Sequence, residues 1–289
     1  MDDIAVKALA KINLGLDVLR RREDGYHEVK MVMQTIHLFD RLQIEKAEDG
    51  IHLETNLPFL PVDESNLAYR AAKLLRDEFS LKEGVHIVLN KRIPVAAGMA
   101  GGSTDAAGVL YGINELFGLG LKRHELMERG VKLGADVPYC IMRGTALAEG
   151  IGEKLTALPP MVKCPVVIAK PQVSVSTRYV YENLKLDEET RHPDIDRLIE
   201  DIRAKKLADI AAHMGNILET VTAVRYPEIE AIKERLCKEG ALNAMMSGSG
   251  PTVFGLFEDI DSARRAASAV RTSGLARQVF VTDIYNNRR

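Results

Sequence analysis

The chain of 289 residues lacks tryptophan and has only three cysteines, Cys140, Cys164 and Cys237. These cysteines are odd in number, lie far apart and form no C-x-x-C spacing. The sequence therefore predicts neither a disulfide framework nor a zinc site. A chain without either kind of cross-link is typical of a reducing compartment, so we expect a cytoplasmic protein.

An excess of charge of one sign is also missing, as are long apolar runs. There are 39 lysine and arginine residues against 41 aspartate and glutamate residues, a formal net charge of −2. Such a chain has no general attraction for nucleic acid or an anionic membrane. The start, residues 1–4, is acidic where a signal peptide is basic, and no window approaches the roughly 18 to 20 apolar residues of a membrane span. We expect a small phosphorylated ligand, with no nucleic acid, membrane or obligatory protein partner.

Hydrophobic residues make up 46% of the chain and charged residues 28%, the balance of a soluble globular protein. The first half mixes both kinds of secondary structure. Apolar residues at helical spacing after Ser65 predict a helix that ends near Phe79, with Ser65 as its cap. Alternating patterns predict strands, of which we expect the first three to form an antiparallel group: 4–20, 36–44, 51–53 and 85–89.

The adjacent prolines Pro159 and Pro160 continue neither a helix nor a strand, and they predict a boundary between domains at residues 1–160 and 161–289. Strand–helix–strand alternation after residue 240 is typical of a ferredoxin-like α+β unit. The elements predicted after the boundary are helices at 176–184, 194–204, 207–220, 227–239 and 260–273 and strands at 166–169, 242–246, 252–257 and 278–284.

Residues 94–104 form a glycine-rich segment that reads Pro-Val-Ala-Ala-Gly-Met-Ala-Gly-Gly-Ser-Thr. It is not a Walker A sequence, because no lysine follows the last glycine. Glycines allow positive φ and a close approach of the backbone to a ligand, and the helix that follows adds the unpaired amides of its first turn. These features predict a phosphate-binding loop. An ordinary tight loop that permits close packing stays open as the alternative.

Four segments, in this order, resemble motifs of the superfamily that includes galactokinase, homoserine kinase, mevalonate kinase and phosphomevalonate kinase, the GHMP kinases. They are Ala10-Lys11-Ile12-Asn13-Leu14, residues 94–104, Gly134-Ala135-Asp136-Val137-Pro138 and Met246-Ser247-Gly248-Ser249-Gly250-Pro251. The resemblance covers essentially the whole chain. It implies the α+β, two-domain GHMP kinase fold, with an N-terminal mixed sheet and helices, a C-terminal ferredoxin-like α+β domain, and ligands between them.

One branch of the superfamily is resembled most closely, on the segment Ala10-Lys11-Ile12-Asn13, the turn Asp24-Gly25-Tyr26-His27 and the segment 174–177 with Tyr181. That branch serves the non-mevalonate route to isoprenoids and phosphorylates a cytidine-diphosphate-linked polyol with ATP. Two alternatives stay open. One is another GHMP kinase, of the homoserine or phosphomevalonate type. The other is a catalytically silent member that binds a nucleotide.

The resemblance implies catalytic roles for Lys11 and Asp136. The ammonium of Lys11 is suited to stabilising charge on the transferring phosphoryl group. The carboxylate of Asp136 would orient the acceptor hydroxyl and take its proton late, because a loose transition state needs little early deprotonation. From the residues alone, an exposed strand lysine and a helix-capping aspartate are the alternatives.

The resemblance also implies ligand contacts in three further groups of residues. The residues expected to bind ATP are Pro94, Val95, Ala96, Ala97, Gly98, Met99, Ala100, Gly101, Gly102, Ser103, Thr104 and Asn66. The residues expected to bind the polyol substrate are Asn13, Tyr26, His27 and Tyr181, and the supporting loop contains Ser247, Gly248 and Ser249. ATP is expected to bring Mg²⁺, for which no ligand set is assigned and Ser103 and Asp105 are only weak candidates.

Overall fold

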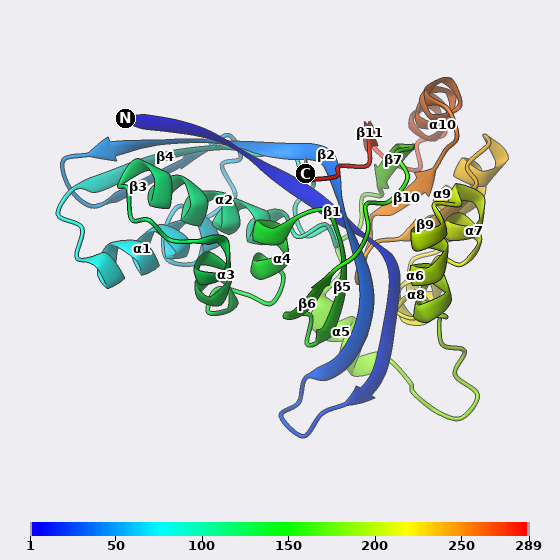
Figure 1. The fold of residues 1–289 in the computed structure, drawn as a ribbon. Helices are drawn as coiled ribbons and strands as arrows, with labels where there is room; N and C mark the ends of the chain where they lie inside the picture. The colour runs from blue at the N-terminus through cyan, green and yellow to red at the C-terminus, as the bar shows by residue number, and fades with distance from the viewer. Residues whose placement is uncertain (1, 288–289) are drawn as a thin grey trace. The chain divides into compact units, whose positions relative to one another are not determined.

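A computed structural model of the chain describes residues 2–287. Counting only these, the chain divides into two compact units. Unit 1 comprises residues 2–10, 38–95 and 100–142, and unit 2 comprises residues 11–37, 96–99 and 143–287. The two longest strands, β1 (Asp3–Arg21) and β2 (His27–Ala47), drawn in blue in Figure 1, contribute residues to both units.

Unit 1 adds two strands and four helices to its parts of β1 and β2: β3 (Ile51–Thr55), α1 (Leu67–Phe79), β4 (Gly84–Asn90), α2 (Gly101–Leu116), α3 (Arg123–Val131) and α4 (Val137–Met142). Strand β4 pairs antiparallel with β2 but parallel with β3. The prediction that β3 belongs to an antiparallel group was therefore wrong. The helix α1 connects β3 to β4, and a helical crossover is the usual connection between parallel strands.

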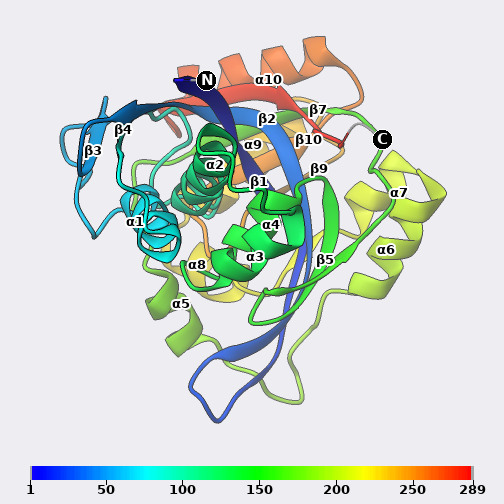
Figure 2. The same cartoon turned by 60° about the vertical axis from the view of Figure 1, so that its left-hand side comes forward.

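Helices α1 and α2 lie side by side in Figures 1 and 2. The buried face of α1 consists mainly of alanine, which allows a close approach. On α2, a Cβ atom at Gly108 would lie 2.5 Å from Leu42 Cδ1, and one at Gly112 would lie 2.4 Å from Ile44 Cδ1. The small residues of α2 thus let it pack directly on β2, which fixes the position of its first turn.

Unit 2 holds the remaining elements: β5 (Thr145–Gly150), β6 (Lys154–Ala157), β7 (Pro165–Lys170), α5 (Thr177–Asn183), α6 (Ile195–Ala204), α7 (Leu207–Ala212), β8 (Gly215–Asn216), α8 (Glu219–Arg225), α9 (Glu228–Lys238), β9 (Asn243–Met246), β10 (Val253–Leu256), α10 (Ile260–Thr272) and β11 (Gln278–Asp283). Four of its strands form an antiparallel sheet in the order β11-β7-β10-β9. Helices α9 and α10 pack on this sheet (Figure 1). This order confirms the predicted ferredoxin-like unit.

One predicted helix in unit 2, residues 207–220, was wrong. The structure has two short helices there, α7 and α8, separated by strand β8. Gly215 and Asn216 of β8 pair in parallel with Gly15 and Leu16 of β1. A Cβ atom at Gly215 would lie 2.8 Å from the side chain of Pro193, so a close backbone approach requires glycine here. Glycine is unfavourable in the interior of a helix, so Gly215 was the feature of the sequence that could have predicted the break between α7 and α8.

The three cysteines are free thiols. Within residues 2–287, none of the helices has both the length and the apolar character that crossing a membrane requires.

Candidate functional site

The glycine-rich loop bends through three residues with left-handed backbone, Ala96, Gly98 and Ala100, whose φ angles are 49°, 69° and 55°. Gly101 and Gly102 instead begin α2 in helical conformation. The expectation that glycines supply the positive φ angles is therefore right for Gly98 only. Alanine pays conformational energy in this region, so the surrounding structure must impose the bend.

The first turn of α2 presents unpaired amides. Its N-cap residue, Ala100, has no side chain that could accept a hydrogen bond. Residues 2–287 provide no acceptor for the amides of Gly101, Gly102 and Ser103, whereas the Thr104 amide donates to the Ala100 carbonyl at 2.8 Å. Gly102 is exposed. Free amides at the positive end of a helix of 16 residues are suited to binding a phosphate group.

Two residues predicted to contact ATP use their side chains for local structure. Thr104 is buried, and its hydroxyl donates to the Leu9 carbonyl at 2.8 Å, which attaches α2 to β1. Asn66 is the N-cap of α1, where Ser65 was predicted. Its Oδ1 accepts from the Ala68 amide at 2.9 Å and its Nδ2 donates to the Pro61 carbonyl at 2.8 Å. Contacts of Asn66 and of the Thr104 hydroxyl with ATP stay predictions.

A buried ionic cluster in unit 1 holds the entry to the glycine-rich loop. The ammonium of Lys91 donates to Asp105 Oδ2 at 2.6 Å and to Asp40 Oδ2. The other oxygen of Asp40 accepts from the amides of Arg92 and Ile93. The three charged side chains are between 0% and 4% exposed. The cluster thus joins β2, the segment before the loop and the first turn of α2.

Sequence reasoning missed Lys91 and Asp40. The available signal was a lysine directly after an alternating strand and just before Pro94. In the structure a Cβ atom at Gly101 would lie 3.3 Å from Lys91 Nζ, so the ammonium sits immediately under the start of α2.

The charges in this cluster are strongly perturbed. Burial raises the pKa of Asp105 well above 3.8, against the lowering effect of Lys91. Burial also lowers the pKa of Lys91, but the carboxylates of Asp105 and Asp40 outweigh it and the net shift is upward. Within residues 2–287, Asp105 Oδ1 is buried without a hydrogen-bond partner. Asp105 is 2% exposed and its Oδ2 already binds the Lys91 ammonium, so it does not fit the role of a ligand to an Mg²⁺ ion that keeps several bound waters.

Lys11 lies in unit 2 and is only 5% exposed. Its ammonium donates to Asn13 Oδ1 at 2.7 Å, and its amide donates to the Met99 carbonyl at 3.3 Å. The alternative of an exposed strand lysine is therefore wrong. Burying an ammonium costs free energy unless polar groups surround it, so this lysine is unlike an ordinary surface residue.

The loop 247–250 contacts both of these segments in unit 2. Ser247 Oγ donates to the Gly98 carbonyl at 2.9 Å and accepts from the Asn13 amide at 3.4 Å. A Cβ atom at Gly98 would lie 2.0 Å from the Ser247 carbonyl oxygen, so the two backbones touch and position 98 requires glycine. The structure thus brings together three of the predicted groups: the Lys11 strand, the glycine-rich loop and the supporting loop.

The turn between β1 and β2 carries the aromatic residues predicted to bind the substrate. Tyr26 is 61% exposed, and its amide donates to Asp24 Oδ1 at 3.1 Å. The ring of His27 lies 5.0 Å from the ring of Tyr181 in α5, with an interplanar angle of 37°. Burial, with a smaller effect of Arg21, lowers the pKa of His27, which favours a neutral imidazole that can donate and accept hydrogen bonds. Such a ring pair is suited to holding a planar base.

Asp136 lies in unit 1 directly before α4 and is half-buried. Its carbonyl accepts from the Cys140 amide at 3.0 Å, the first backbone bond of that helix. The residue therefore stands where the sequence places it, at a helix start.

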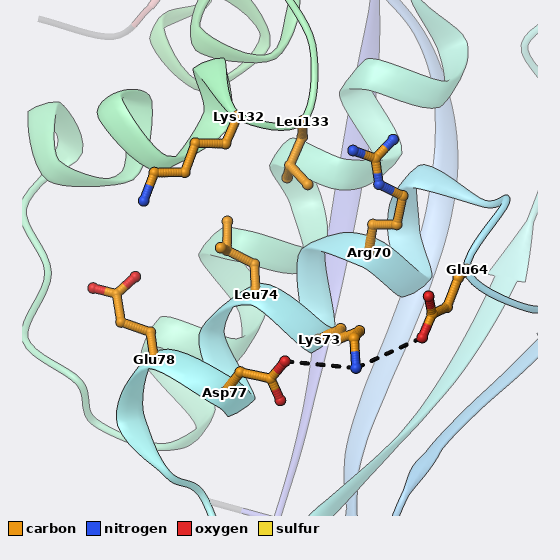
Figure 3. Close-up of a pocket in the computed structure, with 8 residues that line it drawn as sticks. All are labelled: Glu64, Arg70, Lys73, Leu74, Asp77, Glu78, Lys132 and Leu133. Atoms are coloured by element: carbon orange, nitrogen blue, oxygen red, sulfur yellow. Dashed lines mark ion pairs between the residues drawn. The ribbon is translucent and has the colours of Figure 1, made fainter.

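A separate surface pocket of about 610 Å³ lies in unit 1 between α1 and the end of α3 (Figure 3). Leu74 and Leu133 face each other across it, and the ammonium of Lys73 lies 3.6 Å from carboxylates of Glu64 and Asp77. None of the residues predicted to bind ATP or substrate lines this pocket. Its mixed charges indicate no particular ligand.

Comparison with known proteins gives matches along the whole chain. The family described as "GHMP kinases N terminal domain" matches residues 66–144, and "GHMP kinases C terminal" matches residues 198–275. A 4-diphosphocytidyl-2-C-methyl-D-erythritol kinase of Lachnospira eligens is 55% identical over 286 residues, 99% of both chains. One of Lachnoclostridium phytofermentans is 53% identical over 289 residues, 100% of this chain and 99% of the other.

Solved structures agree with these sequence matches. A 4-(cytidine 5'-diphospho)-2C-methyl-D-erythritol kinase matches with a TM-score of 0.85 at 35% identity, covering 98% of this chain and 100% of the other. A homoserine kinase from Cytophaga hutchinsonii matches with a TM-score of 0.82 at 20% identity, covering 100% of this chain and 96% of the other. At that identity the second likeness shows the fold alone.

Proposed function

Because the chain belongs to the GHMP kinases and, among them, to the family of 4-diphosphocytidyl-2-C-methyl-D-erythritol kinases, we propose that it transfers the γ-phosphoryl group of ATP to the 2-hydroxyl of 4-diphosphocytidyl-2-C-methyl-D-erythritol. This is a step of the non-mevalonate route to isoprenoids. The observation that carries the proposal is the full-length identity above one half with kinases of that name. The contacts of Lys11, Asn13, Gly98 and Ser247 support it.

The phosphates of ATP are proposed to bind at residues 94–104. The free amides of Gly101, Gly102 and Ser103 supply donors without any basic side chain. Charge neutralisation of the β- and γ-phosphates is what Mg²⁺ supplies when it is bound. Within residues 2–287, no group of three or more metal-binding side chains occurs. The hydroxyl of Ser103, at the start of α2, is the side chain that fits best as a contact to the metal, with phosphates and water as its main ligands.

Two residues are proposed to act on the reacting groups. The buried ammonium of Lys11 stabilises negative charge on the transferring phosphoryl group, and its bond to Asn13 fixes its direction. The carboxylate of Asp136 orients the acceptor hydroxyl and receives its proton late in the transfer. Each role is a prediction that substitution can test.

The cytidine end of the acceptor is proposed to bind at Tyr26, His27 and Tyr181, where two aromatic rings and a neutral imidazole are available. Stacking on an aromatic ring contributes about 1–3 kcal/mol per base.

The domain boundary at residue 160 and the cytoplasmic location stay predictions from the sequence.

The test is an acceptor comparison with the purified protein, ATP and Mg²⁺. ADP release is measured with 4-diphosphocytidyl-2-C-methyl-D-erythritol, homoserine and phosphomevalonate as separate acceptors. We expect rapid release with the first alone. Turnover with either of the others instead would support a different GHMP kinase. No turnover with any acceptor, together with ATP binding, would support the silent nucleotide-binding alternative.

A further inference from the structure

Asn216 lies in β8, and its side chain reaches the supporting loop. Its Nδ2 donates to the Met246 carbonyl and to the Gly248 carbonyl, both at 2.8 Å, while its Oδ1 accepts from the Leu218 amide at 3.0 Å. The residue is 6% exposed. This arrangement needs two donors and an acceptor on one short side chain. Aspartate lacks the donors, and serine has only one.

The two carbonyls that Asn216 binds belong to the residues on either side of Ser247. Three other side chains also hold this loop. Glu219 Oε1 accepts from the Met246 amide at 2.7 Å, Thr222 Oγ1 donates to the Ser249 carbonyl at 3.3 Å, and the Thr177 and Ser249 hydroxyls share a hydrogen bond at 2.8 Å. Each of these bonds one side of Ser247 only. Asn216 bonds the residues on both sides and therefore holds the backbone that carries the Ser247 side chain.

The position of Ser247 matters because its hydroxyl bonds Gly98 of the glycine-rich loop and the amide of Asn13. Asn13 in turn accepts from the ammonium of Lys11 at 2.7 Å. Hydrogen bonds and the short stretches of backbone between them thus connect Asn216, through residues 246–248, to Lys11 and to the loop 96–99. All of these residues belong to unit 2.

We propose that Asn216 is a positioning residue for phosphoryl transfer. By holding Ser247 it keeps the Lys11 ammonium and the backbone at Gly98 in the geometry that the reaction needs. It acts through Ser247 and touches neither ATP nor the acceptor. The role in transfer rests on the proposed function, whereas the hold on the loop can be measured without it.

The variant Asn216→Asp keeps the size of the side chain and replaces both donors by an oxygen that faces two carbonyl oxygens. We expect kcat to fall by about 10²-fold, because small displacements of reacting groups are that costly. KM for ATP and for the acceptor should change far less, since Lys11 acts mainly on the transition state. On acidification the introduced carboxyl group regains one donor, so the ratio of variant to wild-type kcat should rise as pH falls.

Asn243→Asp is the matched control. Asn243 lies in β9 and also bridges two backbone groups: its Nδ2 donates to the Ala211 carbonyl at 2.7 Å and its Oδ1 accepts from the Ala244 amide at 2.8 Å. It bonds none of the residues 247–250. We expect this variant to lose thermal stability while its kcat stays within about twofold of wild type.

Hydrogen exchange of the folded proteins gives a readout that needs no activity. The Ser247 amide donates to the Thr252 carbonyl and the Gly250 amide to the Ser247 carbonyl. Both amides should exchange faster in Asn216→Asp but not in Asn243→Asp. If Asn216→Asp does not fold, Asn216→Ser, which keeps one donor, should fold and show an intermediate kcat.

The proposal would be overturned by a wild-type kcat together with unchanged amide exchange in Asn216→Asp. If Asn216→Asp does not fold, the same result in Asn216→Ser would overturn it. A loss of kcat equal to that of Asn243→Asp would also overturn it, since the effect would then be one of stability. If the wild-type protein itself transfers no phosphate, the proposed function fails, and the exchange rates alone decide whether Asn216 holds the loop.

Discussion

Lys11→Met is expected to lower kcat by a factor of about 10²–10⁴ while the protein stays folded. Methionine keeps the length and apolar stem of the side chain but removes the positive charge. That charge is buried, where an ammonium stabilises a developing negative charge more strongly than it would in water. Steady-state kcat with ATP and the cytidine-linked acceptor is the measurement, with single-turnover rates to separate chemistry from product release.

Lys7→Met serves as the control for this substitution. Lys7 lies on the same strand but is exposed, with its ammonium 4.8 Å from the centre of the Phe39 ring. We expect kcat to be nearly unchanged. If Lys11→Met kept a kcat near that of Lys7→Met, Lys11 would have no part in the transfer.

Lys91→Met should lower the free energy of unfolding by about 3–5 kcal/mol, the usual cost of removing one member of a buried ion pair. The substitution leaves the carboxylates of Asp40 and Asp105 buried without their cation. It also removes the link between the entry of the glycine-rich loop and the first turn of α2. Urea unfolding at constant pH, followed by circular dichroism, measures the change.

The loss of unfolding free energy in Lys91→Met should depend on pH. The pKa of Asp105 is raised by burial, so the folded chain holds that proton more tightly than the unfolded chain does. The contribution of Asp105 to the free energy of unfolding therefore falls as pH rises from about 3.8 through the raised pKa. Lys91 lowers the Asp105 pKa, so without it the fall continues to higher pH. The gap between variant and wild type should be narrow in acid and widen toward neutral pH.

Two further variants make this result specific. Lys46→Met removes a surface ion pair, Lys46 with Glu83 at 3.1 Å, and should cost less than about 1 kcal/mol. The double variant Lys91→Met with Asp105→Leu removes a carboxylate together with the cation and should recover part of the stability. A loss in Lys91→Met as small as that in Lys46→Met, with no dependence on pH, would contradict the account of the cluster.

The sequence predicted the fold well wherever pattern and motif agreed. The sheet of β7, β9, β10 and β11 confirms the ferredoxin-like unit predicted from strand–helix–strand alternation after residue 240. The helix predicted at 207–220 failed because tertiary pairing of Gly215 with Gly15 outweighed local helical periodicity. The N-cap of α1 is Asn66, one residue after the predicted Ser65. Ser65 instead donates hydrogen bonds to Asp63, and Asn66 caps the helix.

The candidate site was predictable where its residues lie in contiguous motifs. Lys11, Gly98 and Ser247 were found that way, and the structure joins them in unit 2. Asp40, Lys91 and Asn216 were missed because their roles depend on partners that lie between 14 and 53 residues away in the chain. No local pattern marks a residue whose importance comes from such pairing.

The most direct test of the central claim is the proton-coupled ³¹P NMR spectrum of the product formed from ATP and 4-diphosphocytidyl-2-C-methyl-D-erythritol. The 2-hydroxyl is on the carbon that carries the methyl branch, which bears no hydrogen. The new phosphomonoester should therefore appear as a singlet, in an amount equal to the ADP formed. A doublet or a triplet would place the phosphate on another hydroxyl, and ADP without any new ester signal would show that no acceptor is phosphorylated.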